Sequence, residues 1–294
     1  MRLTLFDDGR LGAVIGSDIL DLTTQIASAQ AHGPAGALHH YIDRLAQGGA
    51  LLDLGSGARK PLAEVTLRAP LPQPGKIIGA PVNYLDHKAE MKYSTSIAEL
   101  GVFLKANSSV IGPGEDIRLP YSDKRTDQEG ELGVVIGRTA SHVSAEDAFH
   151  YVFGYTCLLD ITVRSDEDRS TRKSFDTFTP LGPWVVTADE VPDPDALELR
   201  CDVNESTRQK VNTRDLIFGV PELVAYISSV MTLHPGDVIA TGTPAGVGPL
   251  HHGDRVVVDI DTVGRLEVGV DATRAVAYDQ RPGRRATVPA ADRH

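Results

Sequence analysis

The stretch Thr126–Gly137, TDQEGELGVVIG, places two glutamates, Glu129 and Glu131, directly before a short apolar run. A continuous run such as LGVVIG is typical of a strand that is covered on both faces. On an extended backbone, side chains two residues apart share a face, so the two carboxylates project together. Carboxylates are rarely buried without a partner or a bound cation. The stretch therefore predicts either a charged strand end or a site for a positive ion.

The composition of the 294-residue chain excludes several classes of protein. The net charge is −11 without clusters of Lys and Arg, which argues against a nucleic-acid partner. No apolar run is long enough to span a bilayer, and the start MRLTLFDDGRLG lacks the apolar core of a signal peptide. Cys157 and Cys201 are too few for a disulfide framework or a thiolate zinc site. We therefore expect a cytoplasmic protein without a membrane partner.

Many short strand patterns and few helical ones predict a mixed α/β fold that is mainly β. Residues 3–16 and 254–270 are each expected to form a hairpin. Helices are predicted over 144–154, between a Ser144 cap and Gly154, and over 220–233, where Pro221 occupies the first turn.

Three prolines in Ala69–Lys76, APLPQPGK, resist both helix and central strand and mark a domain boundary. We expect a small N-terminal domain at 1–70, a catalytic domain at 71–278 and a C-terminal tail at 279–294.

Asp160 is a third carboxylate in an otherwise apolar segment, TCLLDITVR. By itself it fits a strand-end carboxylate bonded to backbone amides, or a salt bridge with Arg164. Together with Glu129 and Glu131, however, it would complete an all-oxygen cluster suited to Mg²⁺ or Mn²⁺.

Two further segments carry residues with possible catalytic roles. In NYLDHKAEM, His87 and Glu90 share a side if the segment is helical, and a carboxylate beside an imidazole favours a general base that acts on water. Exposed His/Glu neighbours are also common. Lys173 in RKSFDTFTPLGPW fits either a surface lysine or a cation that neutralises charge on a substrate oxygen.

In their order along the chain, these segments resemble the fumarylacetoacetate hydrolase family, and in particular its bacterial, acylpyruvase-like members. The resemblance covers about residues 75 to 265. The matching segments are NYLDHKAEM, FLKANSSVIGPGEDI, DQEGELGVVIG, FGYTCLLDITVR, KSFDTFTPLGPW, TLHPGDVIATGTPAGVG and GDRVVVDID. The resemblance implies the family's mixed-β catalytic fold with a small N-terminal domain, and a homodimer with one Mg²⁺ or Mn²⁺ per subunit.

The resemblance also implies a role for each matching residue. It implies metal ligation by Glu129, Glu131 and Asp160, and a catalytic set formed by His87, Glu90 and Lys173. The substrate-binding positions that it implies are Tyr84, Arg164, Thr177 and Thr243.

Two features depart from the family pattern. Glu167 stands where many members have glutamine, and a carboxylate there would repel an acidic substrate. The segment SDEDRST before Lys173 is also shorter than in many members. We therefore expect an altered or more open substrate pocket.

The function implied by the resemblance is metal-dependent hydrolysis of a carbon–carbon bond in a β-diketone or acylpyruvate-type 2-oxoacid, as in aromatic catabolism. His87, oriented by Glu90, would activate water, and the cation and Lys173 would stabilise the developing negative charge. The same site would also suit a 2-oxoacid decarboxylase, isomerase, or hydratase or dehydratase. A non-catalytic metal-binding dimer is the alternative outside the enzymes.

Overall fold

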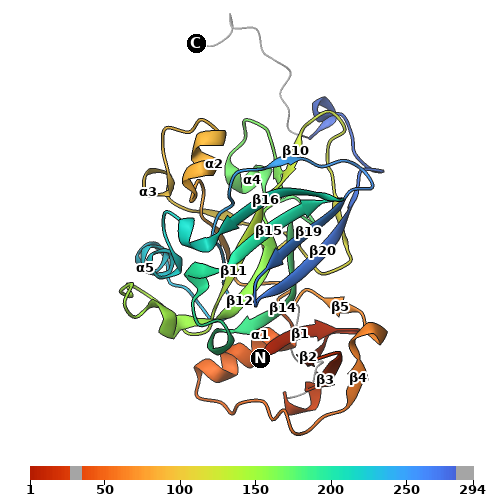
Figure 1. Cartoon of the computed structure of the whole chain (residues 1–294), viewed down its shortest axis with the longest axis vertical. Helices are drawn as coiled ribbons and strands as arrows, with labels where there is room; N and C mark the ends of the chain where they lie inside the picture. Colours follow the sequence, from red (N-terminus) through yellow and green to blue (C-terminus); the bar gives the residue numbers. More distant parts are fainter. Residues whose placement is uncertain (27–34, 283–294) are drawn as a thin grey trace, which may run out of the picture.

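The computed structural model describes residues 1–26 and 35–282, and its strand-rich architecture confirms the predicted mixed α/β class (Figure 1). Within this part of the chain, the largest sheet has 12 strands. Ten follow one another in the order β4 (Arg59–Pro61), β3 (Asp18–Asp21), β2 (Arg10–Ile15), β1 (Arg2–Phe6), β14 (Thr179–Thr187), β12 (Val152–Leu159), β11 (Gly130–Ile136), β17 (Val238–Ala240), β6 (Ile77–Gly79) and β7 (Phe103–Lys105). The other two, β5 (Leu67–Arg68) and β8 (Val110–Ile111), pair with β1 and β14.

Two smaller sheets and several helices complete the described fold. A five-stranded sheet has the order β16 (Ser206–Asn212), β15 (Glu198–Val203), β19 (Arg255–Ile260), β20 (Gly264–Asp271) and β9 (Asp116–Arg118). A three-stranded sheet has the order β13 (Thr162–Val163), β10 (Thr126–Gln128) and β18 (Gly248–Pro249). The α-helices are α1 (Gly36–Ala46), α2 (Leu85–Glu90), α3 (Ile97–Leu100), α4 (Arg169–Arg172) and α5 (Val220–Val230). The 3₁₀ turns are η1 (Thr23–Gln25), η4 (Leu62–Glu64), η5 (Asn107–Ser109), η6 (Ala148–Tyr151), η7 (Ala188–Glu190), η8 (Pro194–Ala196), η9 (Thr213–Asp215) and η10 (Tyr278–Gln280).

Strand β11 lies between two hydrophobic cores, as its apolar run predicts. Every residue from Gly130 to Ile136 is buried. Leu132 and Val134 pack into a core shared with the five-stranded sheet and α5, whereas Val135 packs into a second core. Because side chains alternate along a strand, these are opposite faces of the same sheet. Burying each such apolar side chain contributes about 1.5–3 kcal/mol, which fixes the register of this strand.

The N-terminal region packs against the second of these cores. Strands β1 to β4 extend the large sheet beyond β14, and α1 packs its apolar side chains into the core around Val135. In Figure 1 this region, coloured red to orange, lies at the opposite end of the molecule from α2 and α4. The predicted hairpin at 3–16 is confirmed by the pairing of β1 with β2. An independent domain at 1–70 stays a prediction, and most of the predicted tail at 279–294 lies outside the described residues.

The prediction of a helix over residues 144–154 is wrong. Ser144 and Asp147 do bond to each other, but the helical conformation is limited to the 3₁₀ turn η6, and Val152 already begins β12. Strand β12 pairs with β11 on one side and β14 on the other, and this central position in the sheet outweighs the local capping signal. The second predicted helix is confirmed as α5, and the predicted hairpin at 254–270 is confirmed by β19 and β20.

Among the described residues, no helix combines the length and apolar character required to cross a membrane.

Candidate active site

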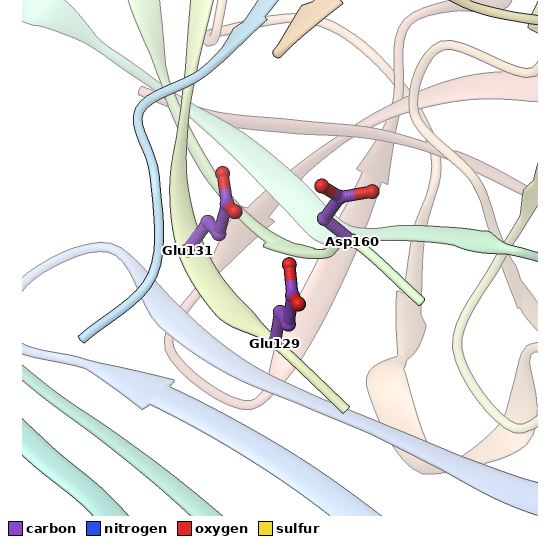
Figure 2. A group of neighbouring side chains, drawn as sticks. All are labelled: Glu129, Glu131 and Asp160. Atoms are coloured by element: carbon purple, nitrogen blue, oxygen red, sulfur yellow. The ribbon is translucent and has the colours of Figure 1, made fainter. Parts of the chain in front are cut away.

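The pairing of β11 with β12 brings the three predicted metal-binding carboxylates together. The register places Gly130 opposite Leu159, and the Asp160 backbone N–H then donates to the Glu129 carbonyl oxygen at 2.9 Å. Asp160 therefore directly follows β12, which ends at Leu159. Each carboxylate offers an oxygen within 4.8 Å of the other two, and Figure 2 shows the three side chains next to one another.

Two buried lysines neutralise part of this negative charge. The Lys173 Nζ donates to Glu129 Oε2 at 2.7 Å, to Thr162 Oγ1 at 2.7 Å and to the Asp160 carboxylate. Lys105, at the end of β7, donates to the other oxygen of Asp160 and to the Phe178 carbonyl oxygen. Asp160 is thus held between two ammonium groups.

Charge and burial set the pKa values of these groups in opposite directions. Burial would raise the pKa of Glu129, but Lys173 and Arg164 hold it below its ordinary value. Burial and the nearby charge of Asp160 raise the pKa of Glu131 well above its ordinary value. Burial would lower the pKa of Lys173, but Asp160 and Glu129 raise it, so this lysine remains protonated. Burial lowers the pKa of Lys105 despite the attraction of Asp160.

The loop after β17 forms hydrogen bonds with Glu131 and with the residue before it. The Gly242 N–H donates to Glu131 Oε2 at 2.8 Å, and Thr243 Oγ1 donates to the Gly130 carbonyl oxygen at 3.0 Å. Gly242 has a φ of +102°, and a Cβ there would lie 2.8 Å from the Cβ of Asn83. Any other residue at this position would have a strained backbone, and its side chain would clash with Asn83, which explains the glycine of the TGTP segment.

His87 and Glu90 meet as predicted, on the short helix α2. His87 Nδ1 lies 3.2 Å from Glu90 Oε2, and the imidazole is buried while Glu90 is partly exposed. The other oxygen of Glu90 accepts a hydrogen bond from the Gly246 N–H at 3.0 Å. This bond ties α2 to the loop that also holds Glu131.

The residues with predicted substrate roles divide into two groups. Arg164 and Thr243 line the same cavity as the three carboxylates, Lys173 and His87. Arg164 is held by Asp127 Oδ2 and Glu129 Oε1, both at 2.7 Å. Tyr84 is buried at the start of α2 and Thr177 accepts from the Arg118 N–H at 2.8 Å, and neither lines this cavity. Their roles in substrate binding stay predictions.

The free space in this cavity is about 30 Å³. That volume holds about one water molecule, so side chains of the lining have to move when a substrate enters.

Glu167, the residue that departs from the family pattern, does not line this cavity. Its carboxylate pairs with Arg281 and accepts from the Ser165 hydroxyl. The predicted repulsion of an acidic substrate is therefore reduced, because Arg281 neutralises the charge.

The sequence reasoning did not assign a role to several residues of the site. Lys105 lies in one of the matching segments, FLKANSSVIGPGEDI, with no spacing to another charged residue that marks it. Asp127 is fully buried between Arg125 and Arg164. Arg169 and Arg172 of α4 also line the cavity. The only signal for the arginines was the repeated basic residue in the segment DRSTRK.

The donor set fits a hard divalent cation of the Mg²⁺ or Mn²⁺ type. Its ligand atoms are carboxylate oxygens, and all three residues are buried. Glu131 forms no ion pair with a Lys or Arg of the described chain, and burial together with the charge of Asp160 raises its pKa. A bound cation would supply positive charge beside it.

Comparison with known proteins places the chain among related enzymes. The protein-family model that describes the C-terminal region of fumarylacetoacetate (FAA) hydrolase matches residues 76–271 of this chain. The maleylpyruvate hydrolase of Aquipseudomonas alcaligenes is 42% identical over 286 residues, which cover 92% of this chain and 99% of the relative. A crystal structure of maleylpyruvate hydrolase from Sphingobium sp. SYK-6, in complex with manganese(II) and pyruvate, is 43% identical with a TM-score of 0.82, covering 94% of this chain and all of that one.

A more distant relative has a different activity. The mitochondrial oxaloacetate tautomerase of Rattus norvegicus is 38% identical over 216 residues, which cover 69% of this chain and 69% of the relative. The matched family model and the similarity to the hydrolases over nearly the whole chain lead to one conclusion. The chain belongs to the fumarylacetoacetate hydrolase family, as its motifs predicted.

Proposed function

We propose that this protein hydrolyses the carbon–carbon bond of an acylpyruvate, with maleylpyruvate as the first substrate to test. The observation that carries the proposal is one cavity that joins a three-carboxylate cluster to His87 and Lys173. The similarity over 92% of the chain to a maleylpyruvate hydrolase supports the same substrate class.

Glu129, Glu131 and Asp160 would hold Mg²⁺ or Mn²⁺, which would act as a Lewis acid toward the oxygens of a 2-oxoacid. The manganese ion in the Sphingobium enzyme supports this assignment.

His87 is arranged to act as the general base. With its Nδ1–H donated to Glu90, its Nε2 is available to take a proton from water. The hydroxide formed adds to the carbonyl carbon of the acyl group, and the bond between that carbon and the methylene carbon of the pyruvate unit breaks. The methylene carbon takes the electron pair of that bond and the proton that His87 removed from water, so the products are pyruvate and a carboxylic acid, which ionises to its carboxylate.

Lys173 is arranged to stabilise negative charge as this bond breaks. Its raised pKa keeps it protonated, and its ammonium group is fixed by three oxygen atoms before any substrate arrives. A preorganised cation in a buried site stabilises developing charge without having to reorient during the reaction.

The test is product analysis in ¹⁸O-labelled water with maleylpyruvate, acetylpyruvate and oxaloacetate, each with Mn²⁺ or Mg²⁺. Hydrolysis predicts stoichiometric pyruvate from an acylpyruvate and one ¹⁸O atom in the new carboxylate. Release of CO₂ without labelled carboxylate would instead identify a decarboxylase.

The tautomerase relative supports a second candidate function on the same site, interconversion of the keto and enol forms of a 2-oxoacid. Proton transfer by His87 alone would serve that reaction. A change in the enol absorbance of oxaloacetate without loss of oxaloacetate would favour this alternative.

Two further parts of the proposal concern assembly and location. We propose a homodimer, as the family resemblance implies, which light scattering after size-exclusion chromatography will test. A reducing, cytoplasmic location is supported by Cys157 and Cys201, which are both buried free thiols.

A further inference from the structure

The short helix α4 presents two arginines to the cavity of the proposed active site. Asp168 caps this helix by accepting a hydrogen bond from the Ser170 N–H at 2.8 Å. Arg169 and Arg172 are three residues apart and therefore share a face of the helix. Both are half-buried and line the cavity, whereas the two residues between them are exposed.

These two arginines differ from the other cations of the site, because neither forms an ion pair within the described part of the chain. Arg164 and Lys173 are each held by two carboxylates. The Nε of Arg172 is buried and has no hydrogen-bond acceptor among the residues that the structure describes. A buried donor without an acceptor is unfavourable, so Arg172 has an unused capacity to bind an anion.

A second carboxylate on the substrate would supply the missing acceptor. The planar guanidinium group binds a carboxylate through two parallel hydrogen bonds, which makes arginine well suited to this recognition. The chain as a whole has a net charge of −11, which repels a dianion. Two arginines without an ion pair in the described chain place positive charge at the lining of the cavity, which attracts such a dianion.

We propose that Arg169 and Arg172 bind the distal carboxylate of a dicarboxylic acylpyruvate, at the end of the molecule remote from its 2-oxoacid group. This inference rests on the proposed function and narrows its substrate class from acylpyruvates in general to those with a carboxylate at both ends. The cavity has free space for about one water molecule, so the lining must rearrange on binding. Within the described chain these two side chains have no ion pair that such a movement would break.

The first test compares two substrates that differ in the distal carboxylate. Maleylpyruvate has it and acetylpyruvate lacks it, whereas both contain the same bond to be cleaved. The double variant Arg169→Gln/Arg172→Gln is expected to lose about 10–100-fold in kcat/KM on maleylpyruvate, mainly through KM, and less than about 3-fold on acetylpyruvate. The matched control is Arg59→Gln/Arg274→Gln, which removes the same charge from two exposed positions outside the cavity and is expected to behave as wild type on both substrates.

The second test measures binding and does not require turnover. Calorimetry with Mn²⁺-saturated protein compares maleate with isocrotonate, the monocarboxylate of the same cis geometry. Maleate is expected to bind about 10-fold or more weakly to the double variant than to wild type, with isocrotonate binding unchanged.

Equal losses on both substrates, or unchanged maleate affinity in the double variant, would overturn the inference. If wild type cleaves neither acylpyruvate, the proposed hydrolase function fails, and the maleate comparison still decides whether the two arginines bind a distal carboxylate.

Discussion

The ammonium nitrogen of Lys173 lies 2.7 Å from Glu129 Oε2, and both side chains are buried beside Asp160. This lysine is the main reason why the pKa of Glu129 stays low despite burial. Glu131 has no such ion pair among the described residues, and burial and the charge of Asp160 raise its pKa. The chain thus builds a carboxylate cluster whose negative charge is only partly neutralised by its own cations.

Replacing Lys173 by Met is expected to destabilise the metal-free protein by about 3–5 kcal/mol, because Glu129 and Asp160 lose a buried partner. Chemical denaturation in the presence of a chelator measures this difference. Lys173→Arg retains the charge and should lose less. Equal free energies of unfolding for Lys173→Met and wild type would show that this ion pair does not stabilise the fold.

Replacing His87 by Ala is expected to lower turnover about 10²–10⁴-fold while Mn²⁺ affinity stays within about 3-fold of wild type. Turnover falls because the proposed general base in the cavity is lost. Metal affinity is retained because the proposed ligands are the three clustered carboxylates, and His87 is not one of them. Steady-state kinetics and metal titration measure the two effects separately. His142→Ala changes an exposed histidine outside the cavity and is the control. A His87→Ala variant with wild-type turnover would remove this residue from the mechanism.

The stability of the metal-free protein is expected to depend on the proton of Glu131. Its folded-state pKa is raised above the ordinary value of 4.5, so its contribution is present at low pH and is lost as the pH rises through the raised value. The low pKa of Glu129 acts in the opposite sense, but only below its ordinary value of 4.5. Thermal unfolding in chelator should therefore show wild type losing stability relative to Glu131→Gln as the pH rises above about 5. Parallel pH profiles for the two proteins would contradict this prediction.

The sequence predicted those parts of the fold and site that depend on local pattern. The apolar run after Glu131 indicated a doubly covered strand, and the two-residue spacing placed Glu129 and Glu131 together. The three-residue spacing of His87 and Glu90 was sufficient because both lie on one helical turn. In each of these cases the partners are close in sequence.

The parts that the sequence did not predict depend on contacts between distant segments. Lys105 meets Asp160, 55 residues away, only because β7 and β12 belong to the same sheet. Glu167 was predicted to repel an acidic substrate because its partner, Arg281, lies far from it in the sequence, near the end of the described chain. The helix predicted over 144–154 rested on a local capping signal at Ser144. The pairing of β12 with β11 on one side and β14 on the other instead gives the second part of this segment a strand conformation.

The central claim is that a divalent cation on the Glu129, Glu131 and Asp160 cluster is required for cleavage of a carbon–carbon bond. The most direct measurement is Mn²⁺-dependent pyruvate release from maleylpyruvate by wild type and by Glu131→Ala, after removal of metal with a chelator. The prediction is that added Mn²⁺ restores pyruvate release by wild type and leaves Glu131→Ala at least about 10²-fold slower. Full Mn²⁺-dependent activity in Glu131→Ala would contradict the metal site, and the absence of pyruvate from wild type would contradict the proposed reaction.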